Sequence, residues 1–124
     1  PWGTEVILGS INDPTFGPTL MFGLGGVFVE VLRDVTFRVA PVSTAHAMKM
    51  LSEIAGAPIL EGVRGEAPRD REALAEALSR YAQMITELGD EISESDANPV
   101  LVYAEGRGIK VVDARIVLSV QNDE

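Results

Sequence analysis

Apolar positions in the first forty residues occur as short runs separated by residues that favour turns. Asn12-Asp13-Pro14 and Gly17-Pro18 follow the first run, and Arg33-Asp34 separates the last two, which predicts a hairpin there. The runs are rich in β-branched and aromatic side chains, which favour strands. We therefore expect three or four short strands joined by tight turns, at residues 2–11, 19–22, 27–32 and 35–40.

The middle of the chain changes to a helical spacing. Ser43 is expected to cap a helix that runs through residue 55, with Gly56 as the C′ residue behind it. Asp70 is expected to cap a second helix, which Gly89 ends, and residues 58–65 between the helices read as an apolar segment and a polar loop. The second helix carries one apolar stripe of only about two heptads, so we expect it to pack on a sheet rather than form a coiled coil. Its members are Leu74, Leu78, Tyr81, Ile85 and Leu88.

A final hairpin is predicted where residues 101–104 and 109–112 flank Glu105-Gly106-Arg107-Gly108. The order of strands, helices and strands predicts an α+β fold with a mostly antiparallel sheet and two helices packed on one side. The 124 residues fit a single domain spanning residues 1–124. Because Pro1-Trp2-Gly3 runs into a strand pattern without an initiator Met, we expect a piece of a longer polypeptide.

Composition narrows the classes of partner. Hydrophobic residues make up 46% of the chain and charged residues 23%, which is typical of a folded globular domain. The net charge of −9 argues against nucleic acid or anionic lipid as the main partner. No apolar run approaches the roughly 20 residues of a membrane span, so we expect no membrane partner. The absence of cysteine excludes disulfides and thiol chemistry.

The strongest candidate for chemistry is the pair Asn98 and Asp113. If Ala104 pairs with Ile109, the two residues lie on one face of adjacent strands as diagonal neighbours, roughly 7–8 Å apart. An amide oxygen and a carboxylate are ligands that Mg²⁺ accepts when substrate phosphates supply others. A register slipped by one residue would put them on opposite faces.

Two structural interpretations compete with a metal site. Asn98 before Pro99 is also ordinary turn chemistry. Asp113 interrupts an otherwise apolar run, and a buried carboxylate is costly unless it is paired. Arg115, expected on the same face, would supply that partner as a salt bridge.

Two further features leave alternatives open. Gly23-Leu24-Gly25-Gly26 lies between two expected strands and is either a turn that needs positive φ or a loop whose N–H groups approach a phosphate. His46 is the single histidine, and no cysteine or second histidine offers it a metal partnership. We expect His46 to be a surface or packing residue of the first helix.

Three stretches carry a resemblance to a known family. Residues 17–32 resemble the signature stretch of the ADP-forming acyl-CoA synthetases (acetate–CoA ligase, NDP-forming). Asp96-Ala97-Asn98-Pro99 and Val112-Asp113-Ala114-Arg115-Ile116 match two further motifs, in the family's order. These enzymes carry an ATP-grasp domain related to the β subunit of succinyl-CoA synthetase. The resemblance implies that this chain is the C-terminal part of such a domain.

The resemblance also implies ligands and site residues. Asn98 and Asp113 match the residues that hold Mg²⁺. Gly25 and Gly26 match the glycine turn on the phosphate side of ATP or ADP, with Glu30 as a further polar contact. The parent would be a cytoplasmic enzyme that joins an acid to CoA through an acyl phosphate and a phosphohistidine.

The same resemblance places other parts of the machinery outside this chain. The nucleotide-binding half, the CoA-binding domain or subunit and the phosphorylated histidine would lie elsewhere, so we assign no catalytic residue here and expect the piece alone to be inactive. Association into a homo-oligomer stays open. The alternative function is a ligand-sensing, non-catalytic module of the kind found in synthetase-like regions fused to protein acetyltransferases.

Overall fold

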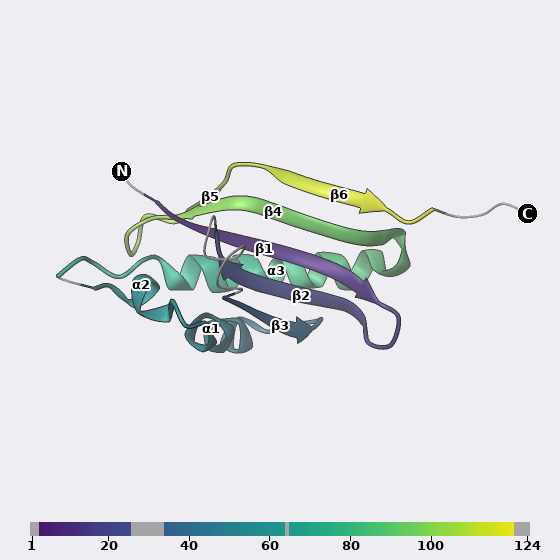
Figure 1. Ribbon diagram of the computed structural model, residues 1–124, viewed down its shortest axis with the longest axis horizontal. Helices are drawn as coiled ribbons and strands as arrows, with labels where there is room; N and C mark the ends of the chain where they lie inside the picture. Colours follow the sequence, from purple (N-terminus) through teal and green to yellow (C-terminus); the bar gives the residue numbers. More distant parts are fainter. Residues whose placement is uncertain (1–2, 26–33, 64, 121–124) are drawn as a thin grey trace, which may run out of the picture.

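The computed structural model describes residues 3–25, 34–63 and 65–120, and it confirms the α+β class. A predominantly β first part is followed by helices and then by further strands (Figure 1). The elements are β1 (Thr4–Asp13), β2 (Gly17–Leu24), β3 (Val35–Val39), α1 (Thr44–Glu53), α2 (Ala57–Glu61), α3 (Arg71–Leu88), the short 3₁₀ turn η2 (Gly89–Glu91), β4 (Ile92–Val102), β5 (Ile109–Val111) and β6 (Ala114–Leu118).

The described strands form one antiparallel sheet in the order β3-β2-β1-β4-β5. β6 also pairs with β4, so β5 and β6 line the same edge of β4, one after the other (Figure 1). The long helix α3 runs along one face of the sheet, with α1 packed beside it. We call the opposite face the open face. It carries Gly9, Met21, Phe37, Asp96 and Arg115, which lie in one row across the sheet.

Both predicted helix caps are confirmed. The Ser43 hydroxyl accepts a hydrogen bond from the His46 N–H (3.1 Å), and the Asp70 carboxylate accepts one from the Ala73 N–H (3.2 Å). These side chains satisfy N–H groups that have no partner within the helix. Gly89 ends α3 with φ +49°, in the left-handed region that glycine reaches without a steric penalty.

The core lies between the sheet and the helices. Along the predicted stripe of α3, Leu74, Leu78 and Ile85 are buried, whereas Leu88 at its end is 37% exposed. Tyr81 of the same stripe is partly buried and its hydroxyl bonds the buried Ser95 hydroxyl of β4 (2.6 Å). Burial raises the pKa of the Tyr81 phenol, and the hydrogen bonds with Ser95 and Ser10 oppose that rise.

Several predicted boundaries are wrong for local reasons. Part of the stretch expected to be an apolar segment and a polar loop forms α2, whose first turn holds Pro58, a residue that suits a helix start. Gly56 has φ −81° and is not a left-handed C′ residue. β4 begins at Ile92, well before the expected hairpin. The strand predicted over residues 27–32 lies outside the described residues.

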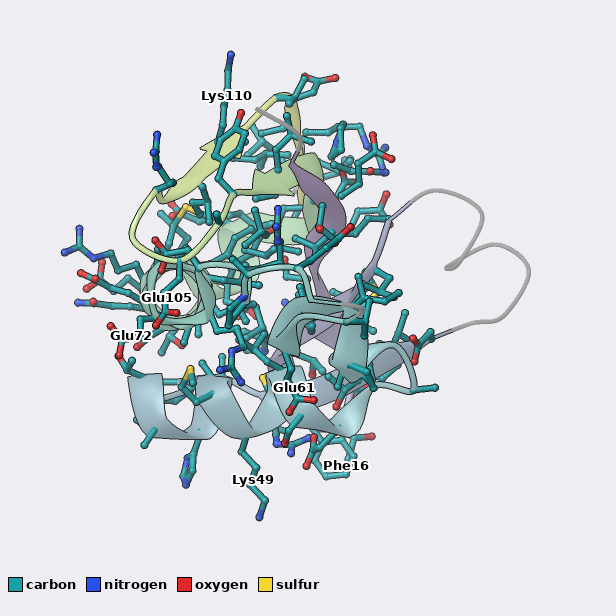
Figure 2. The ribbon with its side chains drawn as sticks, turned by 90° about the vertical axis from the view of Figure 1, so that its left-hand side faces the viewer. Phe16, Lys49, Glu61, Glu72, Glu105 and Lys110 are labelled. Atoms are coloured by element: carbon teal, nitrogen blue, oxygen red, sulfur yellow. The ribbon has the colours of Figure 1, made fainter. Side chains whose placement is uncertain are left out.

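Viewed along the strands, α1 lies at one end of the molecule and β5 at the other (Figure 2). α1 carries Lys49 on its outer side, pointing into solvent, and Lys110 of β5 points away from the sheet at the opposite end. The row of open-face residues around Asp96 lies between these two ends, on β1, β2, β3, β4 and β6.

Candidate functional site

The β4–β5 hairpin turns earlier than the sequence predicted. Val102, and not Ala104, pairs with Ile109. The turn is closed by the Arg107 N–H, which donates to the Ala104 carbonyl (2.8 Å), and Gly106 has φ +83° within it. The predicted register is therefore wrong by two residues. Because a shift of two leaves every side chain on its face, the predicted common face of the strands is unaffected.

Asn98 and Asp113 lie directly opposite each other, not on a diagonal. The Asn98 N–H donates to the Asp113 carbonyl at 3.0 Å, and the Val112 N–H donates to the Pro99 carbonyl at 3.0 Å. The hydrogen bond between Asn98 and Asp113 brings the backbones of the two residues closer together than the predicted diagonal arrangement would.

A β-bulge determines where the Asn98 side chain lies. On β1 only Ile7 stands opposite both Asn98 and Pro99, between the regular pairs Val6–Val100 and Leu8–Ala97. Ala97 and Val100 are both buried against the helices, so the two residues between them are turned away from the core. Asn98 is exposed on the open face, next to Asp96 along the strand.

The environment of Asp113 contradicts the salt-bridge interpretation. Asp113 is exposed, and its carboxylate accepts a hydrogen bond from the Ala114 N–H (2.9 Å). Arg115 instead donates to Glu94 (3.0 Å) and lies 3.4 Å from Asp96. The premise of a buried carboxylate that needs a cation is wrong, because the chain leaves the regular ladder between β5 and β6 at this residue.

This donor set fits a hard divalent cation that also binds phosphate. Asn98 supplies an amide oxygen and Asp113 a carboxylate, both solvent-accessible and projecting from paired segments. Within the described residues no three His, Cys, Asp or Glu side chains gather into a metal-binding group. Mg²⁺ is commonly held by one or two protein oxygens and completes its coordination with water and substrate phosphates. The pair fits that mode of binding and not an all-protein cage.

Gly25 is explained by close packing and not by positive φ. Its N–H donates to the Glu5 carbonyl at 2.8 Å, which extends the β1–β2 pairing by one residue. A Cβ placed on Gly25 would lie 3.0 Å from the Glu5 Cβ and 3.2 Å from its carbonyl carbon. Gly25 is not among the described glycines with positive φ, so the turn interpretation is wrong for this residue. Gly26 and Glu30 lie outside the described residues.

His46 lies on the surface of α1, as the sequence predicted. Its side chain is exposed, and its backbone N–H takes part in the Ser43 cap. The open-face row is on the strands β1, β2, β3, β4 and β6, and the Asn98–Asp113 pair is on β4 and the segment between β5 and β6.

Sequence reasoning missed the polar cluster of Glu94, Asp96 and Arg115. These residues border a depression of about 180 Å³ on the open face, whose other walls include Gly9, Met21 and Phe37. The signal was present in the sequence. Glu94 and Asp96 alternate with the inward-facing Ser95 and Ala97, which places both acids on the face opposite the core.

A larger depression of about 750 Å³ lies near the β4–β5 turn, and the predicted site residues that the structure describes, Gly25, Asn98 and Asp113, do not line it. Its walls come from the start of β1, the loop before α3 and the turn itself, and its lining residues include Glu66, Tyr103 and Arg107.

None of the helices in the described part of the chain is both long and apolar enough to cross a bilayer.

Comparison with known proteins gives close matches. The chain is 53% identical over 116 residues to the β subunit of acetate–CoA ligase [ADP-forming] II from Pyrococcus furiosus, which covers 94% of this chain and 49% of that subunit. A crystal structure of a Pyrococcus horikoshii protein superposes with a TM-score of 0.92 at 45% identity, over 98% of this chain and 51% of the other.

A third match is a structure of the dinucleotide-forming acetyl-coenzyme A synthetase 1 of Ca. Korarchaeum cryptofilum, in complex with coenzyme A and Mg-AMPPCP. Its TM-score is 0.88 at 53% identity, over 96% of this chain and 55% of that one. The chain thus spans about half the length of these relatives. A family model described as an ATP-grasp domain matches residues 1–118. Since that match extends over nearly all of the sequence, the chain belongs to the ATP-grasp domain family.

Proposed function

We propose that this chain is the part of an ATP-grasp domain that binds Mg²⁺ and the phosphates of ATP or ADP in an ADP-forming acyl-CoA synthetase. The parent would convert an acid, CoA and ATP into acyl-CoA, ADP and phosphate through an acyl phosphate and a phosphohistidine. The observation that carries the proposal is that Asn98 and Asp113, both exposed, stand opposite each other and are joined by a backbone hydrogen bond of 3.0 Å.

The proposed roles follow from the chemistry of the two side chains. The Asp113 carboxylate and the Asn98 amide oxygen would hold Mg²⁺ together with phosphate oxygens. A metal ion bound there supplies charge neutralisation for phosphoryl transfer, a reaction in which positioning and electrostatics provide most of the catalysis. The hydrogen bond from the Ala114 N–H restricts the Asp113 carboxylate, which reduces the entropy that binding has to remove.

The relatives support this assignment at the level of ligand class. The similar Korarchaeum enzyme has been crystallised with Mg-AMPPCP, a magnesium complex of an ATP analogue, and with coenzyme A. Gly25, Gly26 and Glu30 remain predicted phosphate contacts. For Gly25, the support is that it has no side chain to keep a phosphate away from the backbone. The Gly25 N–H itself donates to the Glu5 carbonyl.

The proposal includes partners outside this chain. The Pyrococcus furiosus relative is named as a β subunit, which fits a CoA-binding partner subunit or domain in the parent. The phosphohistidine would come from that partner. His46 lies exposed on α1, away from the proposed metal pair, and we assign it no part in phosphoryl transfer.

The test is substitution of the metal pair in the full-length parent protein. Asp113→Asn removes the charge that neutralises phosphate, and we expect acyl-CoA formation to fall by roughly a hundredfold or more, since several kcal/mol of stabilisation are lost. The Mg²⁺ concentration for half-maximal rate should rise in the same variant. Steady-state rates across a Mg²⁺ titration measure both quantities.

Asp13→Asn is the matched control. Asp13 is also a carboxylate that accepts backbone N–H bonds, from Thr15 and Phe16, but it lies at the far end of β1. The control should keep the Mg²⁺ dependence of the wild type. Wild-type turnover and Mg²⁺ dependence in Asp113→Asn would refute the proposed metal site.

A further inference from the structure

Asp96 is a carboxylate placed one step along the strand from the proposed metal pair. Asp96 and Asn98 project from the open face of β4, two residues apart, which is about 6.8 Å along a strand. Opposite them stand Arg115 and Asp113, respectively. The two pairs therefore follow each other along β4, with the Ala97–Ala114 pair between them.

Asp96 offers a second carboxylate on β4, two residues from Asn98. Its side chain is 32% exposed, and a flexible carboxylate is the ligand type that Mg²⁺ prefers. If Asp96 joined the coordination, it would take a place that the proposed function needs for phosphate or water. Some contact has to direct this carboxylate elsewhere.

Arg115 makes that contact. Its guanidinium lies between two carboxylates, 3.0 Å from Glu94 and 3.4 Å from Asp96. A guanidinium offers several N–H donors in a planar fork and holds carboxylates with defined geometry. Asp96 lies directly opposite Arg115. Glu94 lies two residues farther along β4, on the side away from Asn98.

We infer that Arg115 is a positioning residue that holds Asp96 out of the metal coordination, so that Asn98 and Asp113 remain the protein's ligands. This inference rests on the proposed function. Arg115 itself touches neither the metal nor the phosphates in this role. It fixes the number of protein ligands at the site, and hence the number of positions left for substrate oxygens.

Removal of the guanidinium should therefore create a third protein ligand. In the full-length parent, with ADP present, we expect Arg115→Met to tighten Mn²⁺ binding, measured by electron paramagnetic resonance. Loss of a nearby positive charge alone would also tighten binding, but that effect would be the same with or without Asp96, since Coulomb contributions from separate charges add.

The double variant separates these effects. We expect Asp96→Asn to weaken Mn²⁺ binding only slightly in the wild type, but by about tenfold more in the Arg115→Met background, a size typical of changes around metal ligands. Water proton relaxation should show one fewer water on Mn²⁺ in Arg115→Met, and the water should return in the double variant. Glu94→Gln, one row farther from the pair, is the matched control and should show no such coupling to Arg115→Met.

Additive effects of Arg115→Met and Asp96→Asn, or an unchanged number of bound waters, would overturn the inference. So would a loss in Asp96→Asn alone as large as that in Asp113→Asn, because Asp96 would then already be a ligand. The Asp113→Asn variant also tests the proposed site itself. Unchanged Mn²⁺ affinity there overturns the proposed function together with this inference, whereas weakened affinity without coupling overturns only the inference. Arg115→Gln serves as a second variant if the methionine variant does not fold.

Discussion

Gly56 lies at the junction of α1 and α2, where a side chain would collide with the core. A Cβ at this position would lie 2.1 Å from the Leu24 Cδ1 and 2.9 Å from an Asp34 carboxylate oxygen. The Asp34 carboxylate accepts hydrogen bonds from the Ala55 and Gly56 N–H groups, at 2.6 and 2.7 Å. The absence of a side chain thus allows the backbone to approach both a core leucine and a nearly buried acid.

Gly56→Ala should therefore destabilise the chain. The backbone angle φ −81° suits alanine, so the cost comes from crowding, and we expect the free energy of unfolding to fall by about 1–3 kcal/mol. Urea unfolding followed by circular dichroism measures it. In the Leu24→Ala background the same substitution should cost clearly less, because the nearest clashing atom is gone. Equal costs in the two backgrounds would contradict this explanation.

At the scale of elements, Asp70 connects a helix to a hairpin. One carboxylate oxygen caps α3 at Ala73, and the other accepts from the Gly108 N–H (2.7 Å) in the segment that leads into β5. The backbone N–H of Asp70 also donates to the Tyr103 carbonyl (2.7 Å). A single acidic residue therefore fixes the start of the long helix relative to the turn of the β4–β5 hairpin.

Because the Asp70 carboxylate has two backbone partners, removing the Asp70 cap should destabilise the protein more than removing the Ser43 cap. Asp70→Ala should lower the free energy of unfolding by about 2–3 kcal/mol, since it loses a cap and leaves the Gly108 N–H without its partner. Ser43→Ala loses a single cap bond and should cost about 1 kcal/mol. Asp70→Asn, which keeps one acceptor oxygen, should fall between them. Denaturant unfolding of the three variants compares these costs, and equal losses for Asp70→Ala and Ser43→Ala would argue against the link to the hairpin.

The elements differ in how far the sequence predicted them. α3 was predicted with its cap, its buried stripe and its end at Gly89, because these are local signals that reinforce one another. The hairpin register was wrong by two residues, because two glycines allowed more than one turn and only the cross-strand hydrogen bonds select it. The bulge opposite Ile7 has no local signal, since it depends on how β4 fits against β1.

The candidate site was predicted in part. The sequence predicted that Asn98 and Asp113 lie near each other on neighbouring segments, and a backbone hydrogen bond joins them, but it misassigned the partner of Arg115. That partner depends on a strand, residues 92–97, that the sequence analysis did not assign before the hairpin. Whether the pair holds a metal remains a prediction.

At the scale of the whole molecule, the described elements share one core. The buried cluster draws on β1, β2, β4 and all three α-helices, and its largest fully buried side chains include Phe22, Leu20 and Met50. The pairing of β1 with β4 joins the beginning of the described chain to its last third. These long-range contacts are the kind that make unfolding cooperative.

We therefore expect the isolated 124 residues to fold without catalysing acyl-CoA formation. The chain spans about half the length of the β-subunit relatives, and the proposed function places the rest of the nucleotide site outside it. Thermal unfolding by circular dichroism should be cooperative, and assays with acid, CoA, ATP and Mg²⁺ should yield no thioester. Turnover comparable to that of the full-length parent would show that the site is complete in this piece.

The bulge at Asn98 and Pro99 also limits how this site could be transplanted. Across the bulge, the edge segment stays in register with β4, from the Ala97–Ala114 pair to the Val100–Val111 pair. The alternation of side chains between the two faces therefore shifts at the same point in both. The pair of β4 with β1 is the one that carries the mismatch, at Ile7. A protein engineer who grafted only the last hairpin onto a regular sheet would obtain the same sequence with Asn98 or Val100 facing the wrong way. The smallest portable unit is three strands, with the neighbour that makes the extra residue necessary.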